Sequence, residues 1–170
     1  MKKRSWIGLV DFRHLDKNGR VLWESLDNRN ALADEGEYAV LDVFLRGGTA
    51  PAGFYIRLFN CSPVETDTLA TLTGEPAGTY GYAAKAVNRD ATAAGWPSLA
   101  LDLGDYMATS VTVTFTASGG VIGPVTNAIL ATTSNNAGKL IAYVALSQTR
   151  TLADGESLQV TYKVKLSEAA

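Results

Sequence analysis

The sequence predicts a mainly β fold: a single domain, residues 1–170, built as a β-sandwich or jelly-roll-like pair of sheets with one helix and an N-terminal β-hairpin. The clearest sign is residues 110–116, where apolar residues alternate strictly with threonines, as in a strand with one buried and one wet face. Turns rich in glycine, proline and asparagine separate seven or eight extended segments. Only one segment has helical periodicity, so helices do not alternate with strands and an α/β fold is disfavoured.

The first predicted element is the hairpin. Residues 6–16 and 20–27 read as two extended segments on either side of Lys17-Asn18-Gly19. An Asn-Gly pair readily adopts the positive φ angles that a tight hairpin turn requires. We therefore expect residues 1–27 to form an N-terminal arm and hairpin that can project from the domain.

One long helix is predicted at residues 31–46. Asn28 or Asn30 can cap its first turn, acidic residues follow at the positive end of its dipole, and Gly47-Gly48 can end it. Gly36 inside the helix costs about 1 kcal/mol relative to alanine, which predicts a close packing contact or a kink there. The apolar stripe of this helix consists of Leu32, Ala39, Val40, Val43 and Phe44, widened by Leu41 and Leu45.

The rest of the chain is predicted to be strands and loops. A short acidic segment, residues 64–72, is expected to form one or two helical turns, and residues 74–81 and 89–106 are expected to be loops. The further strands are expected at residues 53–60, 82–88, 110–116, 121–132, 140–147 and 157–166.

Length and composition limit the possible functions. A chain of 170 residues buries roughly 70% of its unfolded surface, enough for a core without metal or disulfide support. Its 15 lysines and arginines against 17 aspartates and glutamates give a net charge of −2, which disfavours nucleic-acid binding. The single cysteine, Cys61, can form no internal disulfide, and with one histidine there is no Cys/His cluster with zinc-ligand spacing. These counts fit folding in a reducing cytosol.

The N-terminus is basic but predicts neither export nor membrane insertion. The apolar run at residues 6–10 is broken by Asp11 and Arg13, so it is too short for the hydrophobic region of a signal peptide. No stretch approaches the roughly 20 apolar residues that cross a bilayer. We expect the basic start to be a solvated terminus or, alternatively, an arm that reaches an acidic neighbour.

No arrangement of residues predicts catalysis. A catalytic triad would need His14, which reads as a solvated polar position in a hairpin strand. Carboxylate pairs occur as in any soluble protein, and neither a phosphate-binding glycine loop nor calcium-loop spacing is present. The sequence thus predicts a non-enzymatic protein with no catalytic residues, cofactor or metal ion.

Aromatic and basic residues are the candidates for an interaction surface. Tyr80 and Trp96 flank or occupy glycine-rich loops and could stack on a sugar, although Trp96 is better explained as a plug at the end of the core. The threonine row of residues 110–116 reads as a solvated sheet face, with a subunit contact as the alternative. The candidate interaction residues are Lys2, Lys3, Arg4, Trp6, Tyr80, Tyr82 and Trp96.

Several segments resemble tailed-bacteriophage virion structural proteins. In those proteins a helix that begins with Asn-x-Leu and contains Glu-Gly-Glu is followed by a Phe-Tyr-x-x-Leu strand and a Gly-Tyr-Ala loop. Residues 30–46, 51–60, 81–83 and 95–96 follow that order, and residues 154–166 are similar to the closing strand of many phage virion domains. Arg57 is a departure, since such strands often carry a small residue there.

The resemblance implies a virion protein made in the host cytoplasm. Its first implication is a capsid decoration or cement protein that bridges neighbouring subunits of the head by many repeated weak contacts. A tail, baseplate or fibre-attachment protein is the alternative within the same class. The alternatives outside it are a carbohydrate-binding receptor module and an enzyme with a cleft built from loop carboxylates. The expected partners are the major capsid protein or other virion proteins and further copies of the chain. Nucleic acid, membrane and small-molecule ligands are not expected.

Overall fold

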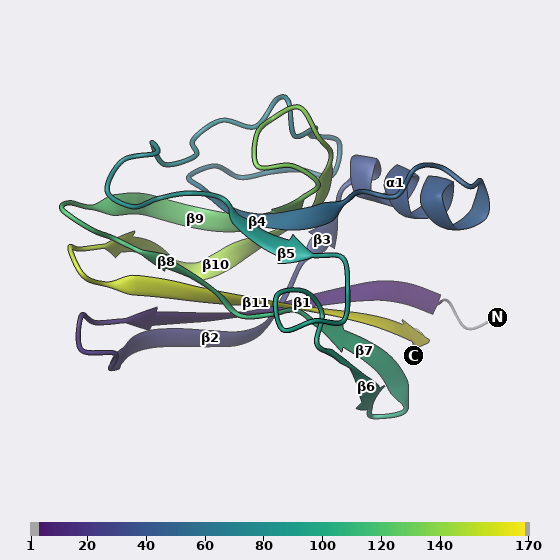
Figure 1. The fold of residues 1–170 in the computed structure, drawn as a ribbon, viewed down its shortest axis with the longest axis horizontal. Helices are drawn as coiled ribbons and strands as arrows, with labels where there is room; N and C mark the ends of the chain where they lie inside the picture. Colours follow the sequence, from purple (N-terminus) through teal and green to yellow (C-terminus); the bar gives the residue numbers. More distant parts are fainter. Residues whose placement is uncertain (1–3, 169–170) are drawn as a thin grey trace.

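Two antiparallel β-sheets face each other, and one helix lies at one end of the pair (Figure 1). The computed structural model describes residues 4–168. Sheet A has the strand order β2-β1-β11-β7-β6, with β8 paired to the first part of β11, and sheet B has the order β3-β10-β9-β4-β5. The predicted mainly β sandwich with one helix is therefore confirmed.

The element bounds follow the chain. The first elements are β1 (Arg4–Leu15), β2 (Val21–Arg29), β3 (Ala31–Leu32), α1 (Asp34–Leu45), β4 (Gly53–Phe59) and β5 (Lys85–Asn88). The later elements are β6 (Ser98–Asp102), β7 (Asp105–Thr109), β8 (Val113–Thr116), β9 (Ile122–Ala131), β10 (Leu140–Leu152) and β11 (Ser157–Glu168).

The main core lies between the two sheets. Val113 and Phe115 of β8 are buried in it. The threonines that alternate with them point away from the core, and Thr116 Oγ1 lies 2.8 Å from Ser157 Oγ across the strand pair. The alternation that predicted this strand is confirmed, although β8 is shorter than the predicted segment and begins at Val113.

The second half of strand β9, residues 127–131, is buried on both faces. Ala128 and Leu130 belong to the core between the sheets. Ile129 and Ala131 belong to a second cluster on the outer face of sheet B, beneath the long loop of residues 60–84. A strand segment covered on both sides favours apolar residues at consecutive positions, which explains the apolar run of residues 128–131.

The predicted N-terminal hairpin is confirmed, and it is part of sheet A. Strands β1 and β2 join through a tight turn in which Gly19 has a φ of 81°. Strand β1 also pairs with β11 from its first residue to its last. The described part of the hairpin therefore does not project from the domain.

Helix α1 is shorter than the predicted helix at residues 31–46. Ala33 is the N-cap, so the expected caps Asn28 and Asn30 were wrong. The reason is that the two residues before Ala33 pair with β10 as the short strand β3. The C-terminal end is as predicted, because the helix stops just before Gly47, whose φ is 73°.

Gly36 lets α1 lie directly on β10. A Cβ at this position would collide with the backbone carbonyl of Ile141, so the predicted close packing contact is confirmed. The Glu35 carboxylate adds a polar tie, since it accepts hydrogen bonds from the backbone N–H groups of Leu69 at 2.9 Å and Leu140 at 2.7 Å. The N-terminal half of α1 is thus fixed to sheet B, and its C-terminal half extends beyond the sheet (Figure 1).

Two predicted segments differ in the loop between β4 and β5. Residues 64–72 form hydrogen-bonded turns but no helix, because the leucines of this segment reach down to the outer face of sheet B. The strand predicted at residues 82–88 begins only at Lys85. Tyr82 lies in the loop before it and buries its ring in the core.

The hairpin of β6 and β7 lies mostly within residues 89–106, which were predicted as a loop. The two strands are joined by Leu103-Gly104, with φ angles of 51° and 93°. Two successive positive φ angles define the tight turn that suits a two-residue hairpin. Leucine is rare in this conformation, so the turn carried a weak sequence signal.

Candidate functional site

Helix α1 and the β6–β7 hairpin lie at the same end of the sandwich, which we term the open end (Figure 1). An apolar groove opens there. The cavity has a volume of about 340 Å³ and almost entirely apolar walls. Both sheets and the helix contribute to them. The walls include Val43 and Phe44 of α1, Phe54 of β4, Ile141 of β10, Val164 of β11, and Trp96.

The groove continues the core. On β11, Leu158, Val160 and Tyr162 are fully buried. The next two residues of the same face are Val164, which lines the groove, and Leu166, which is 65% exposed. The inward face of sheet A therefore runs beyond the closed core and is only partly covered by α1 at the open end.

Large apolar side chains flank the groove on both sides. Phe44 of α1 is 84% exposed, and Leu103 at the tip of the β6–β7 hairpin is 96% exposed. Nine apolar residues of α1, the β6–β7 hairpin and β11, which we term the open-end apolar set, are each more than half exposed. They are Tyr38, Leu41, Phe44, Leu45, Leu99, Leu101, Leu103, Tyr106 and Leu166. Three of them, Tyr38, Leu41 and Leu45, lie on the side of α1 away from its groove-lining residues.

Trp96 forms part of the groove wall. Its ring meets the ring of Phe54 edge-on, with 6.2 Å between centroids and 89° between planes. The side chain is partly buried and packs against the main core. One of the predicted interaction residues therefore lies at the groove, in a position where it also closes the end of the core.

Tyr80 lies elsewhere. It is half exposed, its φ is 53°, and its ring lies against Gly120 in the loop after β8. The end of β8 pairs with Ser157 of β11, whereas the groove lies at Val164, seven residues or about 23 Å along the same strand. Tyr80 and Trp96 are thus not brought together as two sides of one sugar-binding platform.

The basic N-terminus is described only in part. Lys2 and Lys3 lie outside the described residues. Arg4 and Trp6 belong to β1, where the backbone pairs Trp6 with Leu166. The beginning of β1 is therefore at the open end.

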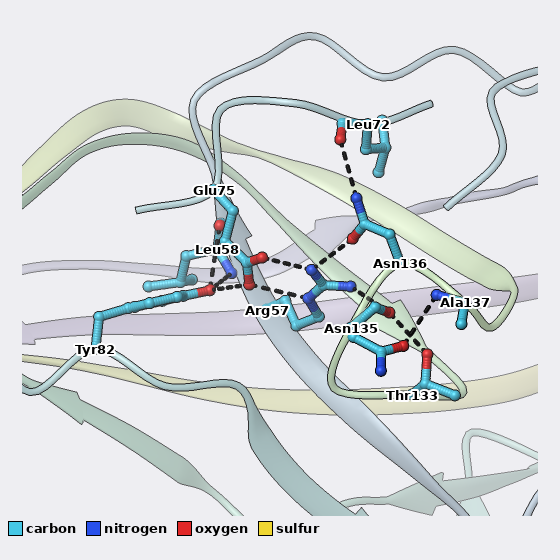
Figure 2. Close-up of polar contacts among 9 residues, drawn as sticks. All are labelled: Arg57, Leu58, Leu72, Glu75, Tyr82, Thr133, Asn135, Asn136 and Ala137. Atoms are coloured by element: carbon cyan, nitrogen blue, oxygen red, sulfur yellow. Dashed lines mark hydrogen bonds and ion pairs between the residues drawn. The ribbon is translucent and has the colours of Figure 1, made fainter. Parts of the chain in front are cut away.

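A cluster of polar residues lies on sheet B (Figure 2). Arg57 of β4 is 2% exposed and forms a two-pronged ion pair with Glu75, whose Oε1 accepts from Nε at 2.9 Å. Its guanidinium also donates to the backbone oxygen of Asn135 at 2.9 Å and to Oδ1 of Asn136 at 2.8 Å. These bonds tie the loop of residues 60–84 and the β9–β10 loop to the sheet.

Tyr82 completes this cluster. Its hydroxyl donates to Glu75 Oε1 at 2.7 Å and accepts from the backbone N–H of Leu58 at 3.0 Å. Burial raises the pKa of Tyr82 well above its usual value, so the phenol stays neutral. Because Glu75 and neighbouring loop residues occupy the polar groups of Arg57 and Tyr82, the cluster leaves no free group aimed at a substrate, and we assign it a structural role.

His14 is not the solvated residue that the sequence analysis expected. It is 4% exposed, and its Nε2 lies 3.0 Å from Glu156 Oε2. It shares the inward face of β1 with Val10 and Phe12, two positions apart in each case. The period-two spacing of these residues was the signal that identified an inward position.

The described residues hold no group of three or more His, Cys, Asp or Glu side chains placed to bind a metal ion. Within the same part of the chain, no helix is long and apolar enough to cross a membrane. Cys61 is a free, half-buried cysteine, and burial raises the pKa of its thiol.

The sequence predicted Trp96 as an interaction residue, but most of the groove was not predicted. The outer positions of α1 were counted as part of one buried stripe, and the leucines of β6 were placed in a loop. The available signal was the apolar spacing of Leu99, Leu101 and Leu103 next to a glycine turn.

Comparison with known proteins shows the family to which the chain belongs. A family model described as podophage GP4 fiber I protein gp80 matches residues 31–164, a span that includes α1, the β6–β7 hairpin and the groove. No curated protein matches the chain. The match covers well over half of the 170 residues and agrees with the resemblance seen in the sequence. The chain therefore belongs to the family of the podophage GP4 fiber I protein gp80 and is a structural protein of a tailed-phage virion.

Proposed function

We propose that the chain is a non-enzymatic fibre or fibre-attachment component of the phage tail, and that its open end binds an apolar segment of a neighbouring virion protein. The fibre assignment is supported by the description of the family that matches residues 31–164. The observation that carries the binding role is the apolar groove flanked by the open-end apolar set.

The size of this surface favours a protein partner. A fully covered apolar side chain contributes about 60–120 Å² of area, so the six members of the set on the groove side, which are 62–96% exposed, present roughly 400 Å². The largest apolar patch of a typical monomer is about 300–600 Å² and is often functional. A standard protein interface buries about 800 Å² per partner, so this surface supplies about half of one side of such an interface.

Capsid decoration, the first implication of the sequence resemblance, has less support than the tail. The family description names a fibre, and nothing in the described residues points to the head rather than the tail. A location in the head and a location in the tail are both compatible with the fold, because a compact β domain can contribute many weak contacts that are repeated in an assembly. We therefore favour a location in the tail. The labelling experiment described below distinguishes it from a location in the head.

Incorporation into particles tests the proposal. Phage that lack this chain are assembled with supplied wild-type chain, with Phe44→Asp, or with Val121→Asp as a control at an exposed apolar residue outside the groove. We expect Phe44→Asp to fold normally and to reduce the particle-bound chain at least about tenfold, and Val121→Asp to leave it unchanged. Equal incorporation of the two variants would contradict a role for the open end.

Gold-labelled antibody against the incorporated chain shows where in the virion the chain is located. We expect the label on tail fibres in electron micrographs. Label on the head would overturn the fibre assignment and support capsid decoration, independently of the result for Phe44→Asp.

A further inference from the structure

Strand β6 is an edge strand without the usual protection. In sheet A it pairs with β7 on one side and with no other described strand. Natural edge strands are commonly blocked by charges, irregular pairing, short length or a covering element. The five residues of β6 carry no charge before Asp102, and its pairing with β7 is regular over the whole strand.

The other edges are protected in these ways. Strand β2 carries three charged residues and pairs with β1 through two irregularities. Strand β3 has two residues, and β5 begins with Lys85. Strand β8 has four residues and buries both of its apolar side chains. The edge of β6 is therefore the one most suited to accept another strand among those described.

The exposed leucines of β6 lie on the groove side of sheet A. Leu99 is opposite Ala108 of β7, and Ala108 is opposite Val164 of β11. Directly opposed residues share a face, and both Ala108 and Val164 line the groove. Leu101, two residues after Leu99, lies on the same face. The two leucines are 70% and 64% exposed.

We propose that β6 pairs antiparallel with β6 of a second copy of this chain, so that sheet A continues across a two-fold axis centred on Ala100. The sequence Ser-Leu-Ala-Leu-Asp is nearly symmetric about its alanine. In this register Leu99 of each copy faces Leu101 of the other, and Asp102 faces Ser98, so apolar residues meet and no like charges are opposed. This self-complementarity is the reason to choose a second copy over a strand of another protein.

The contact is small, and we expect it to be weak in isolation. Four leucines and two short backbone edges bury less than a standard interface of about 1,600 Å². Such a pair gains strength where neighbouring copies are held at high effective concentration, as in a virion. The solution measurement therefore has to extend to high protein concentration.

Light scattering after size exclusion tests the pairing with the full chain. From about 1 μM to about 1 mM, the range in which weak interfaces dissociate, the mass of wild-type chain should rise from one copy to two. A mass of one copy throughout this range would overturn the proposal.

Charge pairing tests the register. One variant carries Leu99→Lys and Leu101→Lys, and a second carries Leu99→Glu and Leu101→Glu. Each alone should stay monomeric, because like charges face each other twice, and an equimolar mixture should form a heterodimer, because each Lys faces a Glu. Dimers of either variant alone, or no heterodimer in the mixture, would overturn pairing through β6.

Two controls keep the result separate from other effects. Both leucines are mostly exposed, so circular dichroism and thermal unfolding should show a folded chain in each variant. Phe44→Asp, which tests the groove, should dimerise like the wild type, because Phe44 lies on α1 and takes no part in the β6 pairing. Loss of dimer in Phe44→Asp together with intact dimers in the leucine variants would place self-association at the groove and overturn this proposal.

Discussion

The buried ion pair between Arg57 and Glu75 allows a quantitative prediction. Glu75→Ala removes the acceptor of two guanidinium donors and leaves a charge that is 2% exposed without a counter-ion. Breaking a buried pair from one side costs about 3–5 kcal/mol. The Glu75 side chain is 26% exposed, so water can replace part of the lost interaction and we expect about 3 kcal/mol. At about 2–4 °C per kcal/mol for a chain of this size, Tm should fall by about 6–12 °C.

Urea and thermal unfolding measure the unfolding free energy lost in Glu75→Ala. Two further variants serve as controls. Glu65→Ala removes an exposed carboxylate from the same loop and should change the unfolding free energy by less than about 0.5 kcal/mol. Arg57→Met combined with Glu75→Leu removes both charges and should cost much less than Glu75→Ala, since apolar replacement of a buried pair is often nearly neutral. If Glu75→Ala is as mild as Glu65→Ala, the ion pair does not hold the loops and the reasoning is refuted.

Three more substitutions have expected outcomes in thermal unfolding. Gly36→Ala should destabilise by about 1–3 kcal/mol despite the higher helix propensity of alanine, because its Cβ meets the carbonyl of Ile141; a higher Tm would show that α1 does not rest on β10. Leu103→Asn should raise stability by up to about 1 kcal/mol, because asparagine tolerates a φ of 51° better than leucine does, and a lower Tm would show that Leu103 has a packing role in the isolated chain. Trp96→Ala should cost about 2–3 kcal/mol, less than a fully buried tryptophan, through lost contact with Phe54, and an unchanged Tm would contradict its place in the groove wall.

The strands that sequence could predict are those whose local pattern agrees with their final environment. Strand β8 has one face in the core and one in water, and the alternation of its sequence shows both. The hairpin of β1 and β2 was predictable from a turn whose residues favour positive φ. In these elements a few consecutive residues are sufficient to predict the secondary structure.

The elements that were missed depend on distant parts of the chain. The cap of α1 could not be predicted from Asn28 and Asn30, because pairing of β3 with β10 fixes where the helix begins. The burial of Arg57 depends on Glu75 and Asn136, which lie 18 and 79 residues away. Neither partner is visible from the strand that carries the arginine.

The candidate site was hard to predict for a related reason. A helix pattern shows which residues are apolar, but it does not show whether another element covers them. Val43 and Phe44 belong to the same predicted stripe, yet Val43 is half-buried and Phe44 is 84% exposed, because the C-terminal half of α1 extends beyond sheet B (Figure 1). An apolar surface meant for a partner and one meant for the core have the same local sequence, and only the tertiary structure separates them.

The residues that stabilise the fold and the residues exposed for binding lie in different parts of this protein. The outer face of sheet B is sealed by loops that Arg57, Glu75 and Tyr82 hold in place, so its apolar residues are committed to the fold. At the open end no such loop covers the described surface, and most of the exposed side chains belong to α1 and to a hairpin at the edge of sheet A. Substitutions on these elements remove few core contacts. They should therefore alter binding while leaving the free energy of unfolding nearly unchanged, whereas substitutions in the Arg57 cluster should do the reverse.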